Sequence, residues 1–94
     1  MSVYVDNMRA RVGRMIMCHM IADSTSELIY MAEHIGVAKR WIHDSGTPRE
    51  HFDICLSARA EAVDRGAIQI TQQALAMKIY ERGKVNDGNR RVGL

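Results

Sequence analysis

The sequence has few aromatic side chains, one proline and no hydrophobic run long enough for a membrane. Only five of its 94 residues are aromatic. The apolar run at residues 15–22 is far shorter than the roughly 18 residues that a membrane span needs. Hydrophobic residues make up 47% and charged residues 26%, close to an ordinary globular mix. These values exclude wholesale disorder, a collagen-like repeat and a coiled coil, and no membrane partner is expected.

The net charge and the number of cysteines are also low. The net charge is +2, and no basic stripe with interleaved aromatics is present, so nucleic-acid binding is not expected. Cys18 and Cys55 show neither a CxxC nor a Cys–His zinc spacing. We expect both to be buried thiols in a reducing cytoplasm. Charged residues from Asp6 onward interrupt any apolar N-terminal stretch, so no signal peptide is expected.

Methionine is abundant where aromatics are scarce. Five of the seven methionines lie in the first twenty residues. Residues 15–22 are apolar on both alternating faces, as in a central strand covered by helices on each side. Flexible thioethers fill such a core, and His19 would lie among them, which argues against a catalytic role for it.

A helix is predicted directly after this strand. Ser24 and Glu27 have the S-x-x-E spacing of a capping box, and Gly36 is placed to end the helix in a left-handed conformation. The strand-then-helix pattern recurs twice more. The expected elements are strands 3–5, 15–22, 52–55 and 68–70, a basic loop 7–13, and helices 24–35, 58–65 and 72–82, with Ser57 and Thr71 as N-caps and Gly66 and Gly83 as stops.

The order β-β-α-β-α-β-α predicts an α/β fold with a single-layer, partly parallel sheet and helices packed on it. Residues 1–83 would form one domain, and residues 84–94 a polar, flexible tail. If the strands preceding the helices are parallel, all three helix N-termini lie at one sheet edge, which favours phosphate. The alternative is that Ser24, Ser57 and Thr71 are only helix caps, and that the arginines near this edge are only surface residues. The candidate ligand-binding residues are Arg40, Trp41, Arg49, His51, Ser57 and Arg59, with Phe52 or Trp41 as rings that stack on a base.

Histidine and aspartate indicate a second kind of site. His51 and Asp53 lie on one strand face with Cα atoms about 7 Å apart, close enough to share a metal, a phosphate or a proton, although a structural hydrogen bond explains them equally well. His19 and Asp23 are about 13 Å apart, too far to bind one ion together. Carboxylate and imidazole ligands suit manganese, iron or zinc. A metal site would draw on Asp6, Asp23, His51 and Asp53, and the sequence leaves open whether a divalent metal takes part.

Six short runs in the sequence carry a family resemblance: Y-V-D-N-M at 4–8, H-M-I-A-D at 19–23, E-L at 27–28, I-G-V-A-K-R-W at 35–41, H-F-D-I at 51–54 and G-A-I-Q-I-T at 66–71. Together they resemble a small phage and bacterial family, the domain-of-unknown-function family 4031, over residues 2–83. The resemblance implies shared polar positions at Asp6, His19, Asp23, His51 and Asp53, and a phage or bacterial setting, but no activity.

Three functions follow as hypotheses. The first is a cytoplasmic, homo-oligomeric module that binds a phosphate-bearing, nucleotide-like ligand, which in a phage setting would sequester a host immune nucleotide signal. The second is a metal-assisted or histidine-based phosphodiester hydrolase, in which His19, His51 and Asp53 would be catalytic and His19 the general base. The third is a protein-interaction adaptor.

Overall fold

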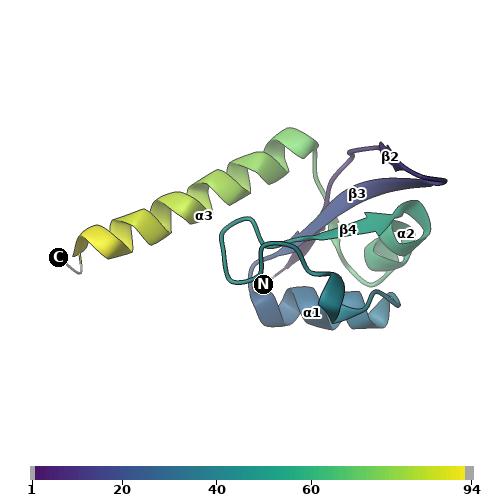
Figure 1. Cartoon of the computed structure of the whole chain (residues 1–94), viewed down its shortest axis with the longest axis horizontal. Helices are drawn as coiled ribbons and strands as arrows, with labels where there is room; N and C mark the ends of the chain where they lie inside the picture. The colour runs from purple at the N-terminus through teal and green to yellow at the C-terminus, as the bar shows by residue number, and fades with distance from the viewer. Residues whose placement is uncertain (1, 93–94) are drawn as a thin grey trace.

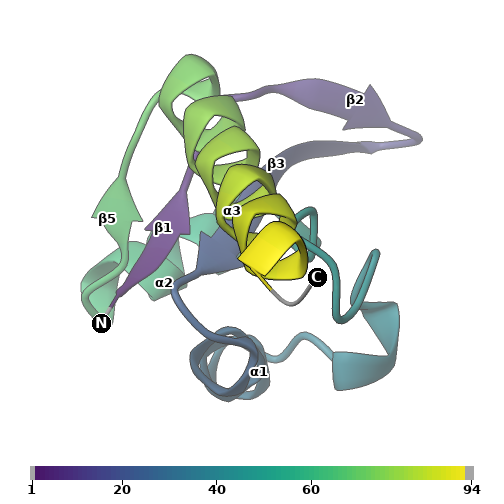
Figure 2. The same ribbon diagram turned by 90° about the vertical axis from the view of Figure 1, so that its left-hand side faces the viewer.

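A five-stranded mixed sheet carries two helices on one face and a long helix on the other (Figures 1 and 2). The computed structural model describes the backbone of residues 2–92 and the side chains of residues 2–84. The α/β fold class is therefore as predicted. The elements are β1 (Val3–Val5), β2 (Ala10–Val12), β3 (Met15–Ala22), α1 (Thr25–His34), the short 3-10 helix η1 (Lys39–Trp41), β4 (Phe52–Cys55), α2 (Leu56–Asp64), β5 (Ile68–Gln69) and α3 (Gln72–Val92).

Strand β3 is the centre of the sheet. It pairs with β1 and β2 along one side and with β4 along the other, and all three pairings are antiparallel. Only β5 pairs in parallel, with β1. Because β3 runs opposite to β4 and β5, α1 begins at the sheet edge opposite to the one where α2 and α3 begin. The expected gathering of three helix N-termini at one edge is therefore wrong.

One strand lies in the segment predicted to be a basic loop. Residues 10–12 pair back onto residues 15–17. The turn between them contains Gly13, whose φ of 60° is accessible to glycine at little steric cost. This tight hairpin adds β2 to the predicted element order.

The predicted start and end of α1 are confirmed. Ser24 is the N-cap, and its hydroxyl accepts a hydrogen bond from the backbone N–H of Glu27 at 3.3 Å. Gly36, just beyond the helix, has a φ of 78°, so it leaves the helix in the left-handed region as expected. Thr71 likewise caps α3, since its hydroxyl accepts from the N–H of Ala74.

Two predicted boundaries are wrong. Cys55, not Ser57, is the N-cap of α2, which begins at Leu56. Gly83 does not end α3, because the helix continues to Val92 and Gly83 does not have a positive φ. A glycine outside the left-handed region is an ordinary, if unfavourable, helix residue. The predicted flexibility of residues 84–94 stays a prediction, and residues 93–94 lie outside the described part of the chain.

The two faces of β3 differ in burial. Cys18, Met20 and Ala22 are buried against α1 and α2 in the hydrophobic core. On the opposite face Ile21 is fully buried, whereas Met15 is 49% exposed and His19 is partly exposed. The expectation that His19 lies in a methionine-filled core is therefore wrong, because methionines of β3 pack tightly only on the α1–α2 side.

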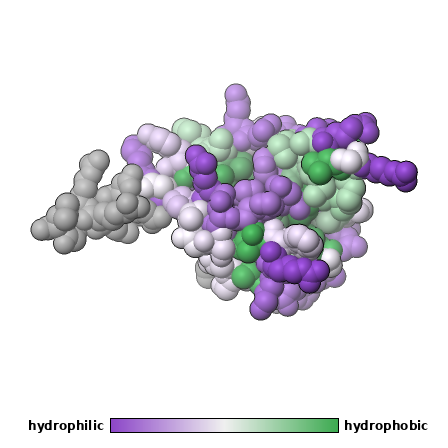
Figure 3. Space-filling model, viewed as in Figure 1, coloured by the Kyte–Doolittle hydropathy of each residue, from purple (hydrophilic) through white to green (hydrophobic). Residues whose placement is uncertain are grey.

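Polar side chains cover most of the face seen in Figure 3, and apolar ones form separate patches between them. Within residues 2–92, no helix combines the length and the apolar character that crossing a membrane requires.

Candidate metal centre

Three polar residues form a row across neighbouring strands on the α3 side of the sheet. The β3–β4 register places His19 directly opposite Asp53. Asp6, the residue after β1, lies on the other side of β3. Its backbone N–H donates to the His19 carbonyl at 3.1 Å. Opposite residues of paired strands present their side chains on the same face. His51, two residues before Asp53, shares that face, so strand pairing brings four of the predicted residues together.

Asp6 orients the His19 ring through a contact with its Nδ1 atom. Its fully buried carboxylate lies 2.8 Å from His19 Nδ1. The same carboxylate accepts from the backbone N–H of His19 at 2.8 Å and of Met8 at 3.3 Å. A carboxylate that already accepts two N–H groups is suited to accept the Nδ1–H as well, which leaves the Nε2 of a neutral ring with a free lone pair. Asp6, predicted as a metal ligand, therefore contacts Nδ1 of His19 and lies on the opposite side of that ring from Asp53.

The His51 ring is held in the same tautomer by the backbone. Its Nδ1 lies 2.6 Å from the carbonyl oxygen of Arg49. Because a carbonyl can only accept, Nδ1 carries the proton, and the Nε2 of the neutral ring presents a lone pair. Both histidines thus direct Nε2 toward Asp53.

Asp53 completes the group. Its Oδ1 lies 3.5 Å from His51 Nε2 and 3.8 Å from His19 Nε2. This oxygen is buried and has no hydrogen-bond partner among the described residues. Three lone-pair atoms that face one another repel unless a positive charge lies among them. Either a second proton on one ring or a metal ion can supply that charge.

The ligand spacing suits a metal ion. One donor atom from each of His19, His51 and Asp53 lies within 4.8 Å of the other two. Two atoms bound at about 2.0–2.2 Å to one ion stand roughly 3–4 Å apart, so the shorter contacts here already match. Two imidazoles and one carboxylate bind zinc in hydrolases and iron in oxygenases. Histidine ligands whose Nδ1–H is held by a carboxylate or carbonyl are also typical of metal sites.

His43 also belongs to this group, although it is not among the site residues predicted from the sequence. Its Nε2 lies 3.5 Å from Asp53 Oδ2, and its ring stacks on that of His51 with centroids 5.0 Å apart. Paired backbone hydrogen bonds join residues 43 and 51. No local spacing signals this contact, because it depends on residues 44–50 folding back into a loop.

Asp23 lies away from the centre. Its carboxylate accepts from the backbone N–H of Ser2 at 2.8 Å and from the Tyr4 hydroxyl at 3.4 Å. These contacts are at the opposite end of β3 from Met15, one residue past Ala22. The structure therefore does not bring Asp23 to the other predicted metal ligands, in agreement with the large separation expected between it and His19.

The predicted phosphate-binding residues are scattered. Arg59 donates from Nε to the Asp6 carbonyl at 2.9 Å and from a terminal nitrogen to the Gln69 side chain. It therefore links α2 to the ends of β1 and β5. Ser57 contacts the Cys55 sulfur at 3.2 Å, in the first turn of α2. Of the six predicted ligand-binding residues, His51 belongs to the group with His19 and Asp53, and Arg49 lies two residues before it.

The predicted stacking rings do not lie at the centre either. Phe52 is fully buried in the hydrophobic core, because it occupies the β4 face opposite to Asp53, and its predicted role is wrong. Trp41 is 60% exposed and lies in η1, where the Arg40 guanidinium covers its ring at 5.1 Å.

A cleft of about 860 Å³ opens onto the side chains of His19 and His51. One wall comes from the sheet and the loop before β4, and the other from α3. The first wall contains His19, Asp44, Thr47, Pro48, Arg49 and His51. The second contains Leu75, Ala76, Ile79, Tyr80, Gly83 and Lys84.

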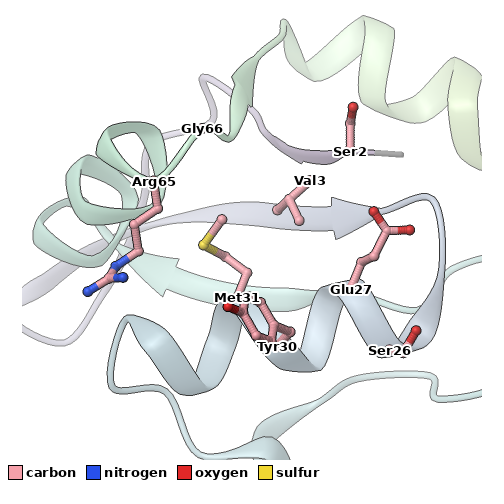
Figure 4. Close-up of a pocket in the computed structure, with 8 residues that line it drawn as sticks. All are labelled: Ser2, Val3, Ser26, Glu27, Tyr30, Met31, Arg65 and Gly66. Carbon is pink, nitrogen blue, oxygen red and sulfur yellow. The ribbon is translucent and has the colours of Figure 1, made fainter.

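A smaller cavity of about 430 Å³ lies elsewhere, between β1, α1 and the end of α2 (Figure 4). Arg65 and Glu27 lie at its two ends, and Met31 and Tyr30 lie between them (Figure 4). None of the predicted site residues lines this cavity, so the chemistry indicated by the sequence points to the larger cleft.

Comparison with known proteins identifies the family but no activity. No curated protein and no solved structure matches the chain. A family model described as "Protein of unknown function (DUF4031)" matches residues 3–82, most of the chain, and confirms the resemblance seen in the sequence. The chain therefore belongs to the DUF4031 family.

Proposed function

We propose that this protein is a metal-dependent hydrolase of small phosphodiesters, with the ion held by His19, His51 and Asp53. The observation that carries the proposal is the convergence of two oriented imidazoles on the buried, unpartnered Asp53 Oδ1. Asp6 and the Arg49 carbonyl fix the two ring tautomers, so that the Nε2 atom of each ring faces Asp53.

The reaction consumes one water. The water oxygen forms a bond to phosphorus, the bond from phosphorus to the leaving oxygen breaks, and that oxygen takes up a proton to balance the one that water releases. A divalent ion supplies two things to such a reaction: it lowers the pKa of water and it neutralises phosphoryl oxygens. Arg49, at the rim of the cleft, is the charged side chain that would face the substrate, and His43 lies beside Asp53 Oδ2.

A first experiment measures metal content. Purified protein is loaded separately with Zn²⁺ and Mn²⁺, freed of excess ion and analysed by mass spectrometry. We expect about one ion per chain in the natural protein and almost none after His51→Ala or Asp53→Ala. His34→Ala is the matched control, because His34 lies on α1, bonded to the Tyr30 carbonyl, and should keep the ion. A natural protein that retains neither ion contradicts the proposal.

A second experiment measures chemistry. The metal-loaded protein is incubated with bis(p-nitrophenyl) phosphate and with a panel of cyclic dinucleotides, and the products are identified by chromatography. Metal-dependent release of a monoester supports hydrolysis. Metal binding without any product contradicts it.

The second candidate function is ligand binding without chemistry. A cleft of about 860 Å³ lies within the roughly 300–1,000 Å³ typical of small-molecule sites, so it suits a ligand of nucleotide size. This is the sequestration of a nucleotide signal expected from the sequence, in the cytoplasm of a bacterial or phage-infected cell. Recovery of intact nucleotide from a tight complex favours it over hydrolysis. Self-association, also expected, is tested by light scattering on the purified protein.

A further inference from the structure

The cleft has two unlike walls. The sheet side presents the metal centre with Thr47 and Arg49, whereas the α3 side presents apolar surface from Leu75, Ala76 and Ile79. A cleft with one polar and one apolar wall fits a ligand that is itself polar at one end and apolar at the other. The metal centre by itself would accept many phosphate esters, whereas the two walls favour an ester that also has an apolar part.

Tyr80 is the aromatic side chain of the apolar wall. It is 61% exposed, although its ring is large and apolar. The Lys84 ammonium lies 5.7 Å from the ring centroid, one helical turn further along α3. An exposed ring at the edge of a cleft can stack against a flat ligand ring, and such stacking tolerates any base because every base has a π face.

Cationic groups lie at the rim on both sides. The Arg49 guanidinium has no hydrogen-bond or ion-pair partner among the residues whose side chains are described, since only the backbone of Arg49 makes such bonds. Lys84 belongs to the opposite wall, and among the described residues that line the cleft only Asp44 is acidic. A planar guanidinium without a partner suits the oxygens of a phosphate, which it can bind with two parallel hydrogen bonds.

We infer that the substrate is a nucleoside phosphate ester whose base lies on Tyr80 of α3 and whose phosphate lies between Arg49 and the metal centre. This inference rests on the proposed function and deepens it, because it names the substrate class and the side of the cleft that recognises each part. The base-binding ring is Tyr80, and neither of the rings predicted from the sequence takes that role.

The test compares two probes that share a ribose phosphate and differ only in the base, AMP and ribose 5-phosphate. Their affinities for the full chain are measured by calorimetry with and without Zn²⁺. We expect AMP to bind about tenfold more tightly, because stacking on one aromatic side chain contributes about that factor or more. Tyr80→Ala should remove the difference between the probes, whereas Arg49→Ala should weaken both by a similar factor.

Met77→Ala is the matched control. Met77 is 57% exposed on the same helix but does not line the cleft, so its removal should leave both affinities unchanged. Equal binding of the two probes to the natural protein, or an unchanged preference after Tyr80→Ala, overturns the inference, as does failure of both probes to bind. Loss of metal binding with a retained preference for AMP would contradict the metal-dependent hydrolase but not the base-binding wall.

Discussion

Asp6 shows how one buried carboxylate can determine the chemistry of a neighbouring residue. It is fully buried, and burying an ionised carboxylate costs several kcal/mol unless hydrogen bonds replace its hydration. Here two backbone N–H groups and the His19 ring provide those bonds. Arg59 adds a bond to the Asp6 main-chain carbonyl. The residue that holds His19 is therefore itself held from several directions.

Replacing this carboxylate tests its positioning role. We expect Asp6→Asn to lower Zn²⁺ affinity by about 10–100-fold, because an amide cannot accept from all three N–H groups and a lost outer partner typically has that effect. The affinity is measured by competition with a chromophoric chelator. Asp44→Asn is the control, since Asp44 lies at the rim of the cleft away from His19 Nδ1. Equal affinities of Asp6→Asn and the natural protein would show that the ring needs no such support.

The two cysteines differ in their ionisation. Burial is the main cause that raises the pKa of Cys18 to about 11. The hydrogen bond with the Ser57 hydroxyl is the main cause that lowers the pKa of Cys55, which lies partly exposed at the N-cap of α2. Cys18 is buried as expected, but the expectation that Cys55 is buried as well is wrong.

This difference predicts a selective reaction with iodoacetamide. Only the thiolate reacts, so Cys55 should be alkylated at neutral pH while Cys18 stays unmodified in the folded protein. With a pKa of about 11 against an ordinary 9.0, Cys18 holds about a hundredfold less thiolate than an ordinary thiol at the same pH. Ser57→Ala should move the Cys55 pH profile to higher pH. Peptide mass spectrometry across pH 6–9 measures both, and equal labelling of the cysteines would contradict this account.

At the scale of elements, α3 differs most from its prediction. Its sequence contains Gly83, and a glycine near the end of an apolar pattern is the usual signal for a helix stop. In the structure α3 passes through Gly83, and a Cβ at this position would meet only Pro48, at an ordinary contact distance of 3.9 Å. The last part of the α3 wall of the cleft, at Gly83 and Lys84, therefore exists only because the helix continues through Gly83.

Replacing each of two glycines with alanine tests whether Gly83 lies inside α3. Gly83→Ala should raise the free energy of unfolding by about 0.5–1 kcal/mol, because alanine is the better residue in a helix interior. Gly66→Ala should lower it by about 1 kcal/mol or more, since its φ of 104° strains any residue with a Cβ. Urea denaturation measures both. If Gly83→Ala destabilises as Gly66→Ala does, Gly83 is a stop and the α3 wall of the cleft ends earlier.

At the scale of the whole molecule, the proposed metal centre joins segments far apart in the chain. His19 comes from β3, whereas His51 and Asp53 come from β4 and the residue before it, with α1 and η1 between them in sequence. An ion bound to all three would couple the central strand to its neighbour. A domain of this size buries a limited core, so such a link should affect its stability measurably.

Metal binding should therefore raise the melting temperature. At a free ion concentration about a hundred times the dissociation constant, linkage adds about 2.7 kcal/mol, which corresponds to a rise of about 10 °C or more in a domain of this length. Scanning calorimetry with Zn²⁺, and then with excess chelator, measures the rise and its reversal. His51→Ala protein should show neither, and a similar rise in that variant would place the ion elsewhere.

Local patterns in the sequence determined much of this architecture. The strands at residues 3–5, 15–22 and 52–55 follow from short runs of apolar residues, and the start of α1 follows from the capping spacing at Ser24. The pairing of His51 with Asp53 follows from strand periodicity alone, because alternate residues of a strand share a face. These features depend on residues close together in the chain, where spacing and chemistry suffice.

Tertiary structure decided what the sequence left open. The antiparallel direction of β3 separated the helix N-termini, and its register set His19 between Asp6 and Asp53. The fold of residues 44–50 added His43, and the course of α3 added Tyr80. Each depends on contacts between residues far apart in sequence, which no local spacing encodes. The amino-acid pattern thus identified most of the reactive residues, whereas strand register and helix placement decided which of them meet.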